Sequence, residues 1–483
     1  MKEFLKLLDM NPLKKLLLAG PILILSGCAS IPVNTELAQT VTDAKLIGVI
    51  APKSLSETRN DLTIGCETLD RDYADYHKYK EYLAELGIRK IRLQAGWAKT
   101  EKEKGVYDFA WLDSIIDDAV SRGIEPWLET SYGNPIYEGG GTTILGAGFP
   151  STEEALTAWD NWVRAMAVRY KGKVHEWEVW NEPDRYFANQ AEEFADFTIR
   201  TAEVIKSVDP DARIAALALA GWRPANFQKV MTHLWKKGKL DLFYWLSYHF
   251  YNYRPEDMYK KQVEPMLDSL KKFQSDIRIR QGETGAPSKG HMGGALSKYD
   301  WSEISQGKWA LRRMLSDKAR DIPTTIFCIC DMNYFKGNDA IKKKNVKGLL
   351  ESDDENNIVR RKQSYYAVQN LVAVWDLMEK IAGDVSVTVG AEGSFSTYAF
   401  ETGTGSHAFL VWDDGRAPVD SVTVSPTPVT VSGASFRNPV CVDIRTGNVY
   451  RIPAKKHGSE WTFTVPVYDS PVLIVDKKLL TLK

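Results

Sequence analysis

The sequence predicts an α/β fold in which a (β/α)8 TIM barrel is followed by a small all-β sandwich. The chain has 483 residues, which is enough for one barrel of about 250 residues with loop insertions and a second, smaller domain. Strand-like and helix-like segments alternate over residues 44–382, which indicates a parallel sheet closed by helices. Short β-rich segments separated by Gly, Pro, Asp and Ser occupy residues 383–483 and are typical of a sandwich.

The first 27 residues are predicted to be a lipoprotein signal peptide. Two lysines precede an apolar run at 16–25, which is too short to span a bilayer as a stable anchor. Leu25-Ser26-Gly27-Cys28 then looks like a bacterial lipobox, with Cys28 as the lipidated N-terminus. The alternative is an ordinary signal peptide with a chance cysteine. Residues 28–43 are polar and without pattern, so we expect a tether that holds the protein to the bacterial cell envelope, at the outer membrane, either periplasmic or surface-facing.

Eight barrel strands are predicted from apolar runs that precede helical periodicity. They lie at 62–66, 88–93, 124–129, 174–180, 213–219, 243–249, 277–281 and 324–330. The run at 46–50 is an alternative first strand, but 62–66 is preferred because a helix follows it at once.

The helices between these strands carry apolar stripes and ordinary end signals. The first, at 73–86, places apolar residues on one face and ends at Gly87. The third begins at a Ser151/Thr152 cap. A helix at 192–208 is stopped by Asp209-Pro210, and one at 362–378 closes the barrel.

Eight short strands are predicted in the C-terminal sandwich. They lie at 385–389, 396–400, 408–412, 422–424, 440–444, 449–452, 461–465 and 472–475. The domain either binds sugar or braces the barrel. Bracing is preferred, since no cluster of exposed aromatic residues stands out in this part of the sequence.

Composition excludes several kinds of partner. The net charge of −1 gives no electrostatic case for nucleic acid. Fifteen Trp and 21 Tyr suit a carbohydrate ligand, because flat sugar faces stack on aromatic rings, although core packing accounts for most of them.

The cysteines give no sign of a metal site. Cys66, Cys328, Cys330 and Cys441 lack the spacing of metal ligands, so we expect buried free thiols, no metal and no cofactor. The oligomeric state stays open.

Two predicted strands end in carboxylates, which is what glycosidic bond cleavage requires. The run Glu176-Trp177-Glu178-Val179-Trp180-Asn181-Glu182-Pro183 reads as a strand that ends at Glu182, and 277–285 reads as a strand that ends at Glu283. One carboxyl group can protonate the leaving oxygen while the other attacks the anomeric carbon.

The unit Trp-Asn-Glu-Pro at 180–183 resembles the motif that closes strand four in clan A of the glycoside hydrolases. The resemblance covers roughly residues 45 to 380 and is greatest to family 39, the β-xylosidase and α-L-iduronidase group, while families 5 and 42 share much of the pattern. It implies a retaining TIM-barrel enzyme with Glu182 as acid/base and Glu283 as nucleophile.

Other residues at predicted strand ends are candidates for substrate binding. Arg92 and Trp97 follow strand two, Tyr132 follows strand three, Asn181 precedes the acid/base, and His249 and Tyr251 follow strand six. Arg92, as in members of the clan, is expected to keep Glu283 ionised and aligned. His249 and Tyr251 share a face and are expected to bind a sugar hydroxyl and steady Glu283.

Strand eight departs from the family pattern. Clan members place a Trp there, as the floor of the sugar pocket, but 327–332 reads Phe-Cys-Ile-Cys-Asp-Met. Either the Trp is replaced or the strand is shifted. The charged residues from Glu67 to Asp72, at the end of strand one, are expected either to read sugar hydroxyls or to cap a helix.

The function predicted is therefore a retaining glycoside hydrolase that cleaves O-glycosidic bonds of oligo- or polysaccharides by double displacement. The alternative is a non-catalytic carbohydrate-binding lipoprotein on the same scaffold. Retention requires the two carboxyl groups to lie about 5–5.5 Å apart. Glu182 has an aromatic residue and an amide before it and no adjacent cation, so a raised pKa, as a general acid needs, is expected.

Overall fold

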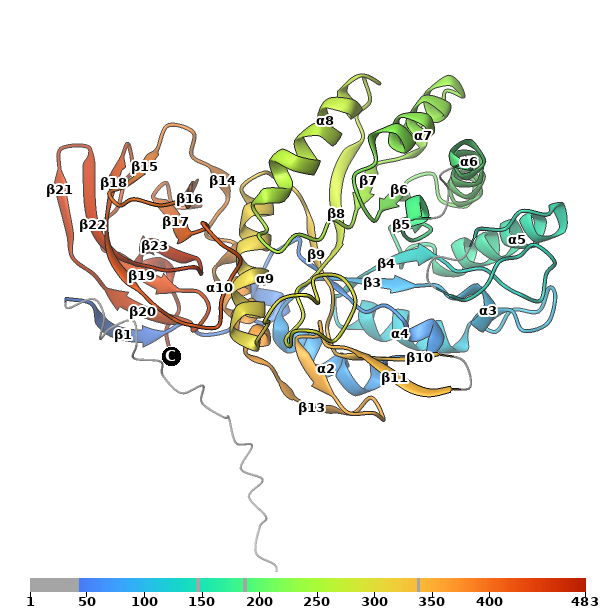
Figure 1. The fold of residues 1–483 in the computed structure, drawn as a ribbon, viewed down its shortest axis with the longest axis horizontal. Helices are drawn as coiled ribbons and strands as arrows, with labels where there is room; N and C mark the ends of the chain where they lie inside the picture. The colour runs from blue at the N-terminus through green and yellow to red at the C-terminus, as the bar shows by residue number, and fades with distance from the viewer. Residues whose placement is uncertain (1–42, 145–147, 186–188, 337–338) are drawn as a thin grey trace, which may run out of the picture. The chain divides into compact units, whose positions relative to one another are not determined.

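The computed structural model describes residues 43–144, 148–185, 189–336 and 339–483, which form a barrel and a two-sheet β domain (Figure 1). The predicted signal peptide, Cys28 and the tether up to residue 42 lie outside the described residues. None of the helices in the described part of the chain has an apolar stretch that could cross a bilayer.

The barrel consists of eight parallel strands that pair in chain order and close between the first and the last. They are β2 (Thr63–Gly65), β3 (Lys90–Gln94), β4 (Glu125–Thr130), β5 (Glu176–Val179), β6 (Arg213–Leu219), β7 (Trp245–Tyr248), β8 (Arg278–Thr284) and β9 (Thr324–Ile326). The predicted TIM barrel is confirmed, as is the preference for 62–66 as its first strand.

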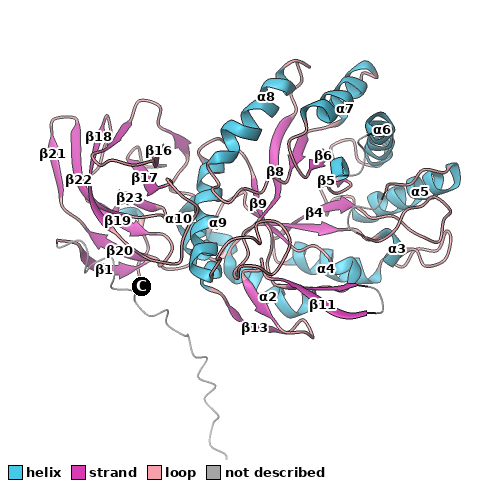
Figure 2. Cartoon of the chain, in the orientation of Figure 1, coloured by secondary structure: helices cyan, strands magenta, loops and turns pink. Residues whose placement is uncertain are grey.

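Helices alternate with these strands along the chain, as Figure 2 shows. They are α2 (Tyr76–Leu86), α3 (Trp97–Thr100), α4 (Ala110–Ser121), α5 (Glu153–Tyr170), α6 (Ala191–Val208), α7 (Pro224–Lys236), α8 (Glu264–Lys271), α9 (Glu303–Lys318) and α10 (Gln363–Trp375). Helix α2 shows why the prediction worked: its apolar stripe is buried, Asp75 accepts a hydrogen bond from the His77 amide at its start, and Gly87 ends it at a φ of 77°.

Two β-hairpins follow the last barrel strand before α10. They are built from β10 (Met332–Lys336) with β11 (Asp339–Asn345), and from β12 (Leu350–Ser352) with β13 (Ile358–Arg361). They are insertions after β9, on the side of the barrel where the carboxyl ends of the strands lie.

The β domain has a seven-stranded and a four-stranded antiparallel sheet, in the orders β1-β20-β19-β23-β17-β16-β14 and β15-β18-β22-β21. Its strands are β1 (Lys45–Val49), β14 (Lys380–Ile381), β15 (Ser386–Val389), β16 (Phe395–Glu401), β17 (His407–Asp413), β18 (Ser425–Ser432), β19 (Pro439–Asp443), β20 (Asn448–Arg451), β21 (Ala454–His457), β22 (Glu460–Val467) and β23 (Val472–Asp476). Since β1 and β14 precede residue 383, the first sheet takes strands from outside the predicted range 383–483. The strand predicted at 422–424 is absent, and β18 begins just after it.

Buried ionic contacts join helix α9 to the β domain. The ammonium of Lys308 donates to Asp469 Oδ1 at 2.6 Å and to the carbonyl oxygens of Val419 and Ser421. Arg312 Nη1 donates to the carbonyl oxygen of Arg416 at 3.0 Å. Barrel and sandwich are therefore joined by polar interactions that are buried from water, which fits a bracing domain.

Candidate active site

The two predicted catalytic carboxylates meet at the carboxyl ends of the barrel strands. One carboxylate oxygen of Glu182, one of Glu283 and one ring nitrogen of His249 all lie within 4.8 Å of one another. Inverting glycosidases need about 6.5–9.5 Å between their carboxyl groups, whereas retaining ones need about 5–5.5 Å. This close approach matches the retaining geometry.

The backbone turns sharply where Glu182 is presented. Trp180 and Glu182 have φ values of 62° and 48°, in the left-handed region, and the Glu182 amide donates to the carbonyl oxygen of Ala218 at 3.1 Å. Pro183 then begins a short 3-10 helix. Left-handed non-glycine residues persist only where the surrounding structure holds them, and they are common at functional sites.

Glu283 lies near the end of β8 and receives two strong donors. Arg92 Nη1 donates to its Oε2 at 3.0 Å, and the Tyr251 hydroxyl donates to its Oε1 at 2.8 Å. Both hydrogen bonds favour the ionised carboxylate, which a nucleophile needs. The predicted neighbourhood of Glu283 is confirmed.

The environment of Glu182 differs from the expectation. Arg185 Nε lies 2.6 Å from its Oε2, and His249 Nδ1 lies 3.5 Å from its Oε1 and 3.7 Å from Glu283 Oε2. Burial raises the pKa of Glu182, but the contact with His249 and the charge of Arg185 outweigh burial, so the pKa is lowered. The prediction of no adjacent cation was wrong: Arg185 is only three residues away in sequence, and the 3-10 helix turns its side chain back.

Arg92 is the centre of a larger buried network than the sequence indicated. Its side chain is fully buried, and all of its nitrogens donate. The acceptors are Glu178 from Nε at 2.8 Å, Glu67 and Glu283 from Nη1 at 2.8 and 3.0 Å, and Glu129 together with Asn181 (3.0 Å) from Nη2. Glu67, Glu129 and Glu178 occupy or follow barrel strands, so their inward alternation was a readable signal.

Of the remaining candidates, Asn181 and Tyr132 reach the site and Trp97 does not. Tyr132 accepts a hydrogen bond from Gln94 Nε2 at 3.0 Å, and the Arg71 guanidinium lies 4.8 Å from its ring centre. Trp97 is fully buried at the start of α3, where its ring stacks with Tyr137 at 5.5 Å. No face of the Trp97 ring is left for a sugar, because the chain turns into α3 immediately after the strand.

Lys347 is a site residue that sequence reasoning missed. It is 3% exposed, and no described residue forms an ion pair or hydrogen bond with its ammonium. Burial lowers its pKa to about 8, although Cys328 and Glu283 oppose that shift. It follows the β10–β11 hairpin, in a run of lysines that gave no sign of which one turns inward.

The end of the eighth barrel strand carries two thiols and no Trp. Strand β9 ends at Ile326, and the buried cysteines 328 and 330 follow it. Together with Cys66 they line a cavity of about 150 Å³ of empty volume that has no room for a water molecule. All three thiols are free, as expected, and burial raises their pKa values.

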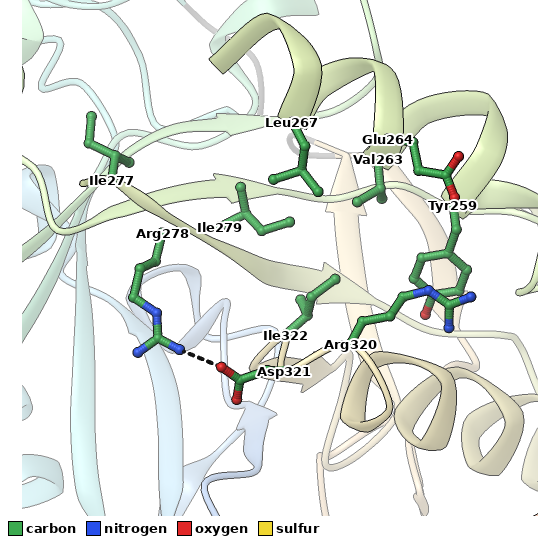
Figure 3. Close-up of a pocket in the computed structure, with 10 residues that line it drawn as sticks. All are labelled: Tyr259, Val263, Glu264, Leu267, Ile277, Arg278, Ile279, Arg320, Asp321 and Ile322. Atoms are coloured by element: carbon green, nitrogen blue, oxygen red, sulfur yellow. Dashed lines mark hydrogen bonds and ion pairs between the residues drawn. The ribbon is translucent and has the colours of Figure 1, made fainter. Parts of the chain in front are cut away.

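A separate pocket of about 440 Å³ lies at the opposite end of β8 (Figure 3). Its lining includes Ile277 and Ile279 at the start of that strand, and an ion pair of 3.0 Å joins Arg278 to Asp321 at its edge. Glu283 is at the other end of β8, so this pocket does not hold the catalytic pair.

Comparison with known proteins supports the family resemblance. Residues 53–269 match the sequence model of "Glycosyl hydrolases family 39". A β-xylosidase of Caldicellulosiruptor saccharolyticus is 30% identical over 161 residues, which is 29% of this chain and 33% of that protein. A β-xylosidase of Geobacillus stearothermophilus is 27% identical over 24% of this chain and 26% of its own length. The chain thus matches about a third or less of these curated relatives.

Solved structures share the fold over most of the chain. A family 39 glycoside hydrolase from Bacteroides cellulosilyticus WH2 aligns with a TM-score of 0.62 and 17% identity, over 88% of this chain and 82% of that one. A β-xylosidase from Caulobacter crescentus CB15 aligns with a TM-score of 0.56 and 16% identity, over 88% and 97%. The resemblance to family 39 that the motifs carry is confirmed by the family match.

Proposed function

From a barrel whose residues 53–269 match the sequence model of glycosyl hydrolase family 39, we propose that this chain is a retaining glycoside hydrolase. The observation that carries the proposal is the approach of Glu182 and Glu283 oxygens to within 4.8 Å of each other at the barrel mouth. A binding protein would gain nothing from two carboxylates so close together, because like charges at this distance repel.

In the first step, Glu283 attacks the anomeric carbon while Glu182 gives its proton to the leaving oxygen. The bond from the anomeric carbon to that oxygen breaks, and an ester to Glu283 forms. In the second step, Glu182 takes a proton from water, which attacks the anomeric carbon and releases Glu283. Arg92 and Tyr251 support this division, since both hydrogen bonds favour an ionised Glu283.

The acid role of Glu182 requires that its ion pair with Arg185 opens when substrate arrives. The Arg185 side chain is 45% exposed, so its cation can leave Glu182 for solvent without being buried unpaired. We infer that the leaving group takes the place of Arg185 beside Glu182. Once that cation is gone, one of the interactions that lower the pKa of Glu182 is removed, so the pKa rises in the direction an acid needs.

The substrate is best sought among β-linked pyranosides. Relatives with partial matches carry the names β-xylosidase, aryl-phospho-β-D-glucosidase and β-galactosidase. The buried ammonium of Lys347 lies near enough to Glu283 for their charges to interact, and a positive charge there would attract an anionic substrate. A panel of neutral aryl glycosides should therefore be tested beside their anionic counterparts.

The decisive experiment compares two variants on activated and unactivated substrates. Glu182→Ala should retain the first step on activated aryl glycosides, lose unactivated substrates, and be rescued by azide. Glu283→Ala should lose both classes, and an activated 2-deoxy-2-fluoro glycoside should label Glu283 in the wild type. Lys104→Met, on an exposed ion pair, is the control variant. Absence of labelling and turnover across the panel would favour the alternative, a carbohydrate-binding lipoprotein.

We also propose that the protein is anchored to the bacterial envelope through a lipid on Cys28. The support is the lipobox-like run at 25–28 after a short apolar segment. Cys28→Ala should move the protein from the membrane fraction to the soluble fraction or stop its maturation. A wild-type protein that is wholly soluble after fractionation would contradict the anchor.

A further inference from the structure

Arg92 donates to more carboxylates than its single positive charge can neutralise. Four glutamates accept from one guanidinium that is fully buried, and Asn181 takes a further donor. An unpaired buried charge costs several kcal/mol, so a group in this position takes up a proton instead. The network therefore holds at least one neutral carboxylic acid when the nucleophile is ionised.

Glu67 is the member that competes directly with the nucleophile. It shares a single nitrogen of Arg92, Nη1, with Glu283, whereas Glu129 and Glu178 use other nitrogens. Its second oxygen, Oε2, is buried and, like Oε1 of Glu178, has no hydrogen-bond partner among the described residues. Glu67 also borders the thiol-lined cavity, which is too narrow for water. An ionised oxygen there would have neither solvent nor a donor.

We propose that Glu67 is a positioning residue that holds a proton while the enzyme is active and thereby reserves Arg92 Nη1 for Glu283. The inference rests on the proposed function. When Glu67 loses this proton, the carboxylates of Glu67 and Glu283 compete for the N–H groups of Arg92 Nη1. The added negative charge weakens both the alignment and the ionisation of the nucleophile. Glu67 would then set the upper pH limit of the first catalytic step.

The groups that face Glu67 support this assignment. They are Arg92 from β3, Glu283 from β8, Tyr251 after β7, Cys328 after β9 and Cys66 on its own strand end. Burial raises the pKa values of Tyr251 and of both cysteines well above neutrality, so these groups stay uncharged. Burial also raises the pKa of Glu67, to about 7, with Arg92 opposing and Glu283 reinforcing the shift.

The test measures inactivation by an activated 2-deoxy-2-fluoro glycosyl fluoride as a function of pH. The reaction joins Glu283 to the anomeric carbon and expels fluoride, so it needs no acid, and a Glu182→Ala background removes the titration of Glu182. The rate should fall about tenfold between pH 6 and pH 8, as expected for a required proton with a pKa near 7. Glu67→Gln in the same background should abolish that fall.

Glu129→Gln is the matched control, because its oxygens already accept from Ser131, Gln94 and Arg92; it should keep the pH dependence. The proposal is overturned if the fall persists in Glu67→Gln or if Glu129→Gln removes it equally.

If Glu67→Gln does not fold, proton release replaces it as the readout. The ester formed with the inhibitor removes the negative charge of Glu283, which helps to raise the pKa of Glu67. The pKa of Glu67 should then fall, so the reaction at pH 7 should release a proton. The absence of proton release would also overturn the proposal. Complete lack of labelling would instead contradict the proposed function.

Discussion

Replacing Lys308 by Met is expected to lower the free energy of unfolding by about 3–5 kcal/mol, the usual cost of breaking a buried ion pair from one side. The Lys308 side chain is fully buried and that of Asp469 is 3% exposed, with 2.6 Å between Nζ and Oδ1. Without the ammonium, Asp469 keeps a hydrogen bond from the Val419 amide but loses its cation. The carbonyl oxygens of Val419 and Ser421 also lose a donor.

Urea unfolding, followed by tryptophan fluorescence and by circular dichroism, measures this change. Lys104→Met is the control, because the ion pair of Lys104 with Glu154 has side chains that are 50% and 58% exposed, and such pairs contribute about 0–1 kcal/mol. The double variant Lys308→Met/Asp469→Asn should recover part of the loss, since it removes the uncompensated charge. A Lys308→Met protein within about 1 kcal/mol of the wild type would refute the view that this pair couples barrel and sandwich.

Three further outcomes are expected. Trp97→Ala should destabilise the fold by about 3–5 kcal/mol while KM of the folded fraction stays unchanged, because Trp97 packs in the core; a raised KM with normal stability would contradict this. Arg185→Ala should raise the pKa of Glu182 in the free enzyme, since it removes a cation that lowers it, and the alkaline limb of kcat/KM should move to higher pH; an unmoved or lowered limb would show that the pair has no effect. The pKa of Glu67 is raised from 4.5 to about 7, so its contribution to stability is present below pH 4.5 and is lost as pH rises to about 7. The free energy of unfolding of Glu67→Gln should lack this pH dependence. Identical pH profiles for the variant and the wild type would contradict it.

Strand order and strand ends were predictable because they depend on local pattern. Apolar runs of strand length alternate with helical stripes, and a parallel barrel then places every strand end at one mouth. Glu182, Glu283, Arg92 and Tyr251 therefore could be assigned to one site before any distance was known. The motif at 180–183 added the roles of the two carboxylates by resemblance.

Contacts between elements distant in sequence were not predictable in the same way. The run at 46–50 has the pattern of a strand, but pattern alone does not name its partner, and the structure pairs it with β20 of the sandwich. Trp97 stands next to a strand end in sequence, yet the turn into α3 buries its ring. Both outcomes depend on backbone direction after a strand ends, which a linear pattern does not record.

The sequence by itself determined the fold class, the candidate catalytic pair and the absence of a Trp at the end of strand eight, because each follows from residue type and local order. Only the tertiary structure decided the electrostatics. It showed that one guanidinium serves four carboxylates, that Arg185 turns back onto Glu182, and that Lys347 is buried without a partner among the described residues. Charge interactions fall off over a few ångströms and depend on burial, so they are set by spatial neighbours that the chain brings together from many strands.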